Sequence, residues 1–330
     1  MAGFLACQTM LGHSMAFFKT HKDLLFGLGM LALFLIGMGM LIFYTGWAET
    51  KNSLSKLGWG QFGILLGLSL GNYCLRALRW HLFTRALNLG ITLPRNVVIY
   101  LAGFALTITP GRVGELVRLR WIKRETGVGL LQSSPMMLGD RAADLSAVAV
   151  LLLISALLGF GGAGGVYWVV ALALGLAFLA TNPKFLSRLI TLAWQALGRG
   201  ARLFAGLRRA FRQLSAFSAW KVAVPALALG ALGWLCEGYA FYLLLGWFDV
   251  KISFWIAVGI FLFAMLGGGA TGLPGGLGGA EAVMIGLLAL QAVPLEAALP
   301  ATIIIRITTL WFAILIGLIV FPLAERKGTI

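Results

Sequence analysis

Two Pro-Gly segments interrupt a chain that is otherwise apolar enough to dissolve in lipid. The first is Pro110-Gly111-Arg112-Val113-Gly114-Glu115, and the second is Pro274-Gly275-Gly276-Leu277-Gly278-Gly279-Ala280-Glu281. Proline and glycine interrupt helices, and irregular backbone is tolerated at membrane depth only where protein buries it or where it lines a polar cavity. The two segments therefore predict irregular polar backbone that is buried inside a membrane protein. Each segment is a candidate to line one shared site.

The composition excludes a soluble globular protein. Of the 330 residues, 60% are hydrophobic and only 11% are charged, which is more apolar surface than a soluble core can bury. The net charge is +15, but the basic residues cluster between apolar runs, so they indicate topology and not a nucleic-acid partner. The three cysteines and three histidines have no ligand spacing, and we expect neither a metal nor another cofactor.

Apolar run lengths predict an all-α, polytopic integral membrane protein, because a spanning helix needs about 20 apolar residues. We expect about six transmembrane helices, which cover Leu24–Trp47, Gly58 to about Arg76, Met136–Phe160, Val166–Ala180, Val222–Trp247 and Ala298–Phe321. Two more apolar stretches run into the Pro-Gly segments. Each continues as a second short piece, so we predict two re-entrant helix pairs, Val97–Ile108 with Val113–Trp121, and Phe254–Gly269 with Ala280–Leu290.

The distribution of basic residues predicts the orientation. With the N-terminus inside, twenty lysines and arginines lie on the cytoplasmic side, against Lys51, Lys56 and Lys251 outside. This bias favours a bacterial-type plasma (inner) membrane with both termini cytoplasmic. The cytoplasmic set includes Arg76, Arg79, Arg95, Arg118 and Arg124.

In this topology the two re-entrant pairs enter from opposite sides of the membrane. The order of helix, re-entrant pair and helix then occurs twice in opposite orientation, as in transporters built from inverted repeats. Within one membrane domain, 1–330, we expect a cytoplasmic N-terminal segment, repeat 1, a basic amphipathic segment on the cytoplasmic leaflet, and repeat 2. Their residues are 1–23, 58–160, 183–217 and 222–321.

Charged residues in the apolar segments are the candidate substrate-binding groups. Glu115 precedes Arg141 by 26 residues, and Glu281 precedes Arg306 by 25. Arg306 is the only charge in 301–320, where an unpartnered charge costs roughly 3 kcal/mol or more. Arg306 either contacts a ligand or forms a structural salt bridge with Glu281. Arg112 precedes a half-helix and either binds an anion there or pairs with Glu115.

Three acids are candidates for proton coupling. Asp140 and Asp144 are one helical turn apart and flank Arg141. They either form a self-neutralising cluster with Arg141, or Arg141 pairs with Glu115 or a lipid phosphate while one of the two acids carries a proton. Glu237 lies near the centre of the fifth predicted span and is either a coupling site or a neutral, hydrogen-bonded structural residue.

Four motifs in a fixed order resemble the lysylphosphatidylglycerol synthase transmembrane-region family. They are Leu75-Arg76-Ala77-Leu78-Arg79-Trp80, Thr109-Pro110-Gly111-Arg112-Val113-Gly114-Glu115-Leu116, Asp140-Arg141-Ala142-Ala143-Asp144-Leu145 and Leu273-Pro274-Gly275-Gly276-Leu277-Gly278-Gly279-Ala280-Glu281. The resemblance covers roughly Gly58 to Phe321. It implies a polytopic module that moves lipid between leaflets, which fused members join to a soluble aminoacyl-transferase domain. This chain ends nine residues after Phe321, so we expect a stand-alone member without that enzyme activity.

The leading hypothesis is a flippase-like or scramblase-like transporter of an anionic or glycosylated lipid. The head group would contact Arg112, Arg141 and Arg306, while Glu115 and Glu281 hold those arginines or compete for them. Stand-alone members linked to hopanoid or glycolipid pathways suggest a lipid-biosynthesis enzyme as a partner besides membrane lipids. The alternatives are a lipid-modifying enzyme that uses Asp140, Asp144 or Glu281 as general base, or a non-catalytic partner of such an enzyme.

Overall fold

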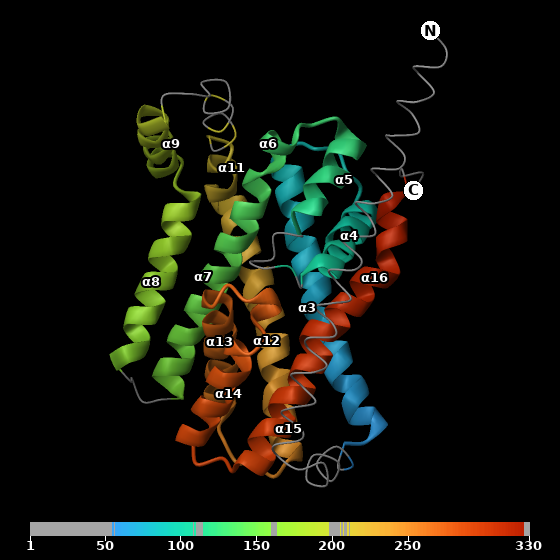
Figure 1. Ribbon diagram of the computed structural model, residues 1–330, viewed down its shortest axis with the longest axis vertical. Coiled ribbons are helices and arrows are strands. Elements are labelled where there is room, and N and C mark those ends of the chain that lie inside the picture. Colours follow the sequence, from blue (N-terminus) through green and yellow to red (C-terminus); the bar gives the residue numbers. More distant parts are fainter. Residues whose placement is uncertain are drawn as a thin grey trace.

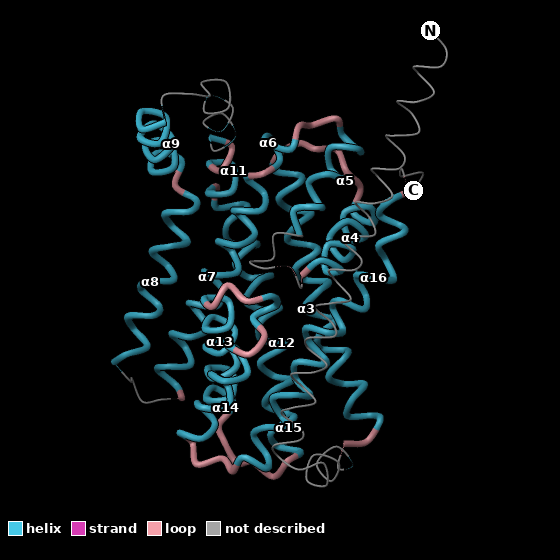
Figure 2. Tube along the Cα trace, in the orientation of Figure 1, coloured by secondary structure: helices cyan, strands magenta, loops and turns pink. Residues whose placement is uncertain are grey.

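The structure, a computed structural model, describes residues 57–107, 115–159, 164–197 and 212–326 and the isolated positions 55, 109, 205, 207 and 210. Every regular element in these ranges is a helix, which confirms the all-α prediction (Figures 1 and 2). The predicted span Leu24–Trp47 and the segment 1–23 lie outside the described residues. So do Pro110, Gly111, Arg112 and Gly114 of the first Pro-Gly segment.

Long apolar helices follow the predicted spans closely. They are α7 (Pro135–Leu158), α8 (Gly164–Thr181), α12 (Trp220–Trp247), and the continuous run of α15 (Leu295–Arg306), η4 (Ile307–Trp311) and α16 (Phe312–Glu325). By length and apolar composition, three helices in the described part can cross a membrane, and a bent pair formed by α8 and α9 (Pro183–Leu197) is a fourth candidate. The total of six spans stays a prediction.

Helix α3 (Trp59–Ala86) extends well beyond the predicted end at about Arg76. The predicted span ended there because Arg76 and Arg79 interrupt the apolar run. Both side chains are buried and bound to carboxylates of α7. A charge that is paired inside the protein does not need to leave the helix for water.

Two pairs of short helices adjoin the Pro-Gly segments. The first comprises α4 (Leu93–Ala102), with its 3₁₀ extension η1 (Gly103–Leu106), and α5 (Val117–Thr126); the second comprises α13 (Phe254–Ala270) and α14 (Gly279–Leu290). In Figure 1 the first pair lies in the upper half of the molecule and the second in the lower half. Pro94 lies in the first turn of α4, and the Ser253 hydroxyl caps α13 by accepting the Ile256 N–H.

The second Pro-Gly segment has the irregular backbone that its glycines predicted. Gly275, Gly276 and Gly278 have φ angles of 61°, 68° and 80°, a region that glycine adopts without the steric cost of a Cβ atom. Pro274–Gly276 forms one short turn, η3, and α14 begins directly afterwards at Gly279. The segment thus separates two helices that would each be too short to span a bilayer.

The two short pairs pack crosswise between the halves of the chain. Helix α4 contacts α3 and α16, whereas α13 contacts α12 and α7. Each of these two short helices therefore packs on the long helix just before it and on a long helix from the other part of the chain. Glycines permit this closeness, because a Cβ atom at Gly317 would collide with the backbone nitrogen of Ala105, and one at Gly268 with the Cβ atom of Ala280. Small residues at such contacts are typical of helix packing in membranes.

Candidate functional site

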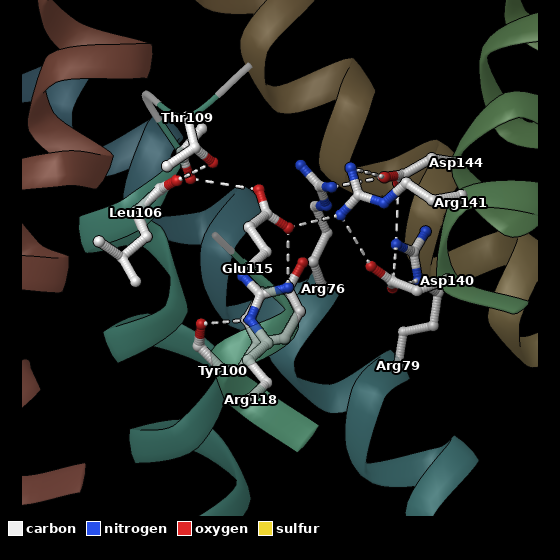
Figure 3. A network of polar contacts seen from close by, with 11 residues as sticks. Arg76, Arg79, Tyr100, Leu106, Thr109, Glu115, Arg118, Asp140, Arg141 and Asp144 are labelled. Atoms are coloured by element: carbon white, nitrogen blue, oxygen red, sulfur yellow. Dashed lines mark hydrogen bonds and ion pairs between the residues drawn. The ribbon is translucent and has the colours of Figure 1, made fainter. Parts of the chain in front are cut away.

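A network of ion pairs connects α3, α5 and α7 in the interior of the protein (Figure 3). Arg76 and Arg79 lie one turn apart on α3, and Asp140 and Asp144 lie one turn apart on α7. Side chains separated by one turn share a helix face, so the two arginines face the two aspartates as a ladder. Glu115, just before α5, and Arg118 and Arg141 complete this arginine network.

The ladder between α3 and α7 is largely buried. Asp140 accepts hydrogen bonds from Arg79 Nε at 3.1 Å and Arg79 Nη2 at 2.6 Å. Asp144 accepts from Arg79 Nη2 at 2.8 Å and from Arg76 Nη2 at 2.5 Å. The side chains of Arg79 and Asp140 have no exposed surface. Removing one partner of such a pair leaves an uncompensated buried charge, which is costly.

Glu115 connects α5 to α7. Its carboxylate accepts from Arg118 Nη1 at 3.0 Å, from Arg141 Nη2 at 2.8 Å and from the Thr107 hydroxyl at 3.2 Å. The Arg118 guanidinium lies 4.2 Å from the centroid of the Tyr100 ring and also contacts Trp80 and Phe104. Planar guanidinium groups favour such stacking. Arg141 is thus paired with Glu115, while the proton-carrying role that the same alternative gave to Asp140 or Asp144 stays a prediction.

The arginine network contains more donors than acceptors. Four arginines face three carboxylates, so the seven ionised groups carry one excess positive charge. Each arginine also has one buried nitrogen without a hydrogen-bond partner among the described residues: Arg76 Nε, Arg79 Nη1, Arg118 Nη2 and Arg141 Nε. Guanidinium donors bind carboxylate and phosphate oxygens, so the chemistry of this surplus is anion binding.

Arg141 is the accessible member of the network. Its side chain is 37% exposed, whereas those of Arg76, Arg79 and Arg118 are nearly or fully buried. Its Nη2 is shared between Glu115 at 2.8 Å and Asp140 at 3.2 Å. Arg141 Nη1 lies 4.0 Å from Asp144 Oδ2. The predicted self-neutralising cluster of Arg141 with the two aspartates is therefore only part of the arrangement, because α3 supplies the main partners of both aspartates.

The second Pro-Gly segment holds a simpler pair. Arg306, the last residue of α15, donates from Nε to Glu281 at 2.6 Å and from Nη2 to the Gly275 carbonyl at 2.8 Å. Its Nη1 lies 3.7 Å from the Met265 sulfur. The structure thus contains the structural salt bridge that was one of the two predictions for Arg306. Glu281 Oε2 is buried and has no hydrogen-bond partner in the described part of the chain.

Tyr73 lies between the two regions. Its hydroxyl donates to the carbonyl of Thr309, which belongs to the π-helical turn η4 directly after Arg306. Its ring lies 5.2 Å from that of Phe104 and 6.0 Å from that of Phe312. A π-helical turn redirects backbone groups and is frequent at functional sites. Tyr73 therefore connects the helix of Arg76 to the helix of Arg306.

Glu237 forms a separate polar contact on α12. It is 6% exposed and accepts a hydrogen bond from Asn72 Nδ2 of α3 at 2.5 Å. The contact is common to both predictions for Glu237, a proton-coupling site and a hydrogen-bonded structural residue. Within the described residues, no group of three His, Cys, Asp or Glu side chains is close enough to hold a metal ion.

The cytoplasmic orientation stays a prediction, and several arginines that it counted have buried side chains. Arg76, Arg79 and Arg118 were assigned to the cytoplasmic side but are buried in the arginine network. Arg95 is also buried, and it donates to Glu125 at 2.7 Å and to the Leu323 carbonyl at 2.8 Å. The spacing of the charges could have indicated the burial of Arg76 and Arg79. Two arginines at i and i+3 on one helix can pair with two acids at i and i+4 on another. Arg112 lies outside the described residues.

A bundle of apolar helices with interior ion pairs and broken half-length helices defines an integral membrane protein. The family description "Lysylphosphatidylglycerol synthase TM region" matches residues 28–317, and the chain belongs to this family. The resemblance that its motifs suggested is thereby confirmed.

Similar proteins include two described as UPF0104 membrane proteins, both from Methanothermobacter thermautotrophicus. One is 26% identical over 296 residues, covering 84% of this chain and 88% of the relative, and the other is 23% identical over 314 residues, covering 87% and 92%. The inner membrane protein YbhN of Escherichia coli is 27% identical over 109 residues, or 33% of each chain.

Proposed function

We propose that this protein is a lipid transporter of the flippase or scramblase type that carries lipids with an anionic head group. The observation that carries this proposal is the surplus of guanidinium donors in the arginine network, which reaches the surface at Arg141. A phosphate that approaches Arg141 meets a guanidinium side chain that is 37% exposed, and its buried Nε has no hydrogen-bond partner among the described residues. The acyl chains would remain in the surrounding lipid while the head group crosses the membrane along the polar interior of the protein.

Crosswise packing of the two short helix pairs supports a transporter built from inverted repeats. The pair α4–α5 and the pair α13–α14 have equivalent neighbours in the two halves of the chain. We propose that they are re-entrant pairs of opposite orientation, within six spans that include Leu24–Trp47, in a bacterial inner membrane with both termini cytoplasmic. Rocking of one repeat against the other would then open the site to alternate leaflets.

We further propose that the protein is not itself an enzyme. A general base needs a carboxylate with a free lone pair near the reacting proton. Asp140 and Asp144 instead accept hydrogen bonds from arginines that hold both acids in ion pairs. These acids are better suited to orient guanidinium groups than to remove a proton from a substrate.

Reconstitution tests the transport proposal. Vesicles that contain the purified protein and a fluorescent phosphatidylglycerol are treated with an impermeant quencher, and the protein is expected to expose the inner-leaflet lipid faster than protein-free vesicles do. Arg141→Gln is expected to slow this exchange by at least about tenfold, because it removes one charge-assisted contact worth ~1.5–3 kcal/mol. Arg85→Gln is the matched control, since Arg85 is exposed on the same helix as Arg76 and Arg79.

The same vesicles separate the competing functions. Exchange no faster than in protein-free vesicles, with folded protein by circular dichroism, contradicts transport of this lipid class. Chromatography of the vesicle lipids after the assay tests for a modifying enzyme, because a new lipid species would contradict the non-enzymatic proposal. Equal rates for Arg141→Gln and Arg85→Gln would show that the arginine network does not contact the head group.

A further inference from the structure

A second polar layer connects α3 and α12 beside the arginine network. Glu237 is the only charged residue among 222–248 of α12, and it is buried. It faces Asn72 of α3, and the next turn of α3 carries Arg76, whose guanidinium carbon lies 5.5 Å from the centroid of the Trp234 ring. Trp234 and Glu237 share a face of α12 because they are three residues apart. Arg76 is therefore the member of the arginine network that lies next to the layer of Glu237.

Several buried polar atoms of this layer have no hydrogen-bond partner among the described residues. They are Asn72 Oδ1, Arg76 Nε and Trp234 Nε1. Roughly 90% or more of buried polar groups in proteins are hydrogen-bonded, so a concentration of exceptions on two adjoining helices needs an explanation. Unused donors and acceptors around one carboxylate allow its hydrogen bonds to be rearranged when its charge changes.

The contact between Asn72 and Glu237 suits either protonation state. An ionised Glu237 accepts from the Asn72 amide N–H at 2.5 Å, as observed. A protonated Glu237 is itself a donor, and half a turn of the Asn72 side-chain amide presents Oδ1 as its acceptor. Gly233 makes room for the amide, because a Cβ atom there would lie 2.6 Å from Asn72 Oδ1.

We infer that Glu237 is a proton-binding site that is coupled to the anion site of the arginine network; the coupling rests on the transport function proposed above. A proton from the aqueous phase adds to one carboxylate oxygen of Glu237, the Asn72 amide turns to accept it, and no other bond is made or broken. Release of the same proton to water restores the carboxylate. Glu237 is favoured over Asp140 and Asp144 because its donor is the neutral amide of Asn72, whereas both aspartates are bound to guanidinium groups.

The charge balance gives the sign of the coupling. The arginine network alone has four positive and three negative groups, so an ionised Glu237 beside Arg76 brings the sum to zero. Protonation of Glu237 leaves one positive charge uncompensated, which favours an anion at the exposed Arg141. Proton and anion therefore stabilise each other, and by thermodynamic linkage each raises the affinity of the site for the other by the same factor.

Other ionisable groups face Glu237 from the described helices that pack around it. On α3 they are Tyr73 and Arg76, and on α7 Asp144 faces it through its ion pair with Arg76. Cys236 is its neighbour on α12. Helices α11 (Ser215–Ser218) and α13, which also pack on α12, contain no titratable residue, whereas α15 contains Glu296 and Arg306, and Arg306 is bound to Glu281.

Infrared spectroscopy of the full-length protein in detergent tests the proton site without any transport. A protonated carboxyl group has its own C=O stretching band, and we expect such a band to grow as the pH is lowered from basic to mildly acidic. The band is expected to be missing in Glu237→Gln and retained in Glu296→Gln, an exposed acid on α15. A band that persists in Glu237→Gln, or one that does not change with pH, would overturn the proton site.

Binding of a short-chain phosphatidylglycerol then tests the coupling. In the wild type we expect the affinity to fall by about tenfold as the pH rises through the titration seen by infrared, at the lower end of usual coupling between two sites. Glu237→Gln imitates the protonated state, so it should bind at all pH values as the wild type does at acidic pH. The same pH dependence in both proteins would overturn the coupling. No binding at any pH would refute the anion site, while the infrared result would still decide whether Glu237 binds a proton.

Discussion

The two Glu–Arg pairs next to the Pro-Gly segments have similar spacing in the sequence and different surroundings in the fold. Glu115 and Arg141 belong to a set of seven charged side chains from three helices, and the Arg141 side chain is 37% exposed. Glu281 and Arg306 form one pair, with side-chain exposures of 14% and 3%. The first region has buried guanidinium donors without partners among the described residues and is exposed at Arg141, whereas the second has a closed contact that also binds the Gly275 carbonyl.

This difference indicates a division of roles. Arg306 ties the irregular Pro274–Gly276 turn and the start of α14 to the end of α15, so its guanidinium fixes the shape of the second segment. The arginine network leaves donors without partners on four arginines. A ligand anion gains more from the first region than from the second, where it would have to compete with a carboxylate at 2.6 Å. Ligand contact at Arg306, the other sequence-based prediction, stays untested.

The largest expected effect comes from breaking the second pair. Arg306→Met leaves the Glu281 carboxylate without its partner, and the loss of one member of a buried ion pair costs about 3–5 kcal/mol. The double variant Arg306→Met with Glu281→Met should recover most of this loss, because an isolated pair can be replaced by apolar side chains of similar volume. Thermal unfolding in detergent measures both.

The same double substitution is expected to fail in the first region. In Arg141→Met with Glu115→Met, the Arg118 guanidinium loses its carboxylate and Asp140 loses one donor, so the double variant should be no more stable than Arg141→Met alone. Recovery of stability there would mean that the seven groups are separate pairs and not one network. Failure of the double variant at 306 and 281 to recover would mean that the second pair is not isolated.

The sequence predicted the order of these pairs because Glu and Arg are rare inside apolar helices and easily recognised there. It could not predict that Arg76 and Arg79 are buried, because a charge at the end of an apolar run equally indicates an exposed helix end. Their partners, Asp140 and Asp144, are 61 to 68 residues away, and only the packing of α3 against α7 decides the matter. The π-helical turn after Arg306 likewise has a tertiary contact that the sequence did not indicate, the hydrogen bond from the Tyr73 hydroxyl to the Thr309 carbonyl.

A second, smaller effect is expected from the glycines that let the short helices approach. Gly317→Ala places a methyl group against the backbone of Phe104 and Ala105, and backbone cannot move aside as a flexible side chain can. Overpacking of this kind costs about 1–3 kcal/mol. Gly268→Ala meets Ala280 in the second pair and should cost a similar amount, since both regions are closely packed. Thermal unfolding in detergent checks the two values.

Gly286→Ala on α14 is the matched control for these two variants, because nothing lies within 4 Å of a Cβ atom there. A glycine inside a helix is less favourable than alanine by about 1 kcal/mol, so this variant should be as stable as the wild type or more so. If Gly317→Ala were equally harmless, the contact between η1 and α16 would have to be looser than the structure describes.

The smallest effect is expected at the outer end of the first region. Arg120 and Glu325 are 3.6 Å apart, but the Arg120 side chain is 69% exposed, and exposed ion pairs contribute only about 0–1 kcal/mol. Arg120→Gln should therefore change the free energy of unfolding by less than about 0.5 kcal/mol, and lipid exchange should not change.

Arg124→Gln, by contrast, removes donors to the Glu325 and Arg326 carbonyls at 2.6 and 3.1 Å. It should cost more, because the Glu325 carbonyl at the end of α16 then loses its donor, although the Arg326 carbonyl keeps Arg95 Nη2 at 2.6 Å. Equal losses in the two variants would place the contribution in the charge of the surface and not in the capping of α16.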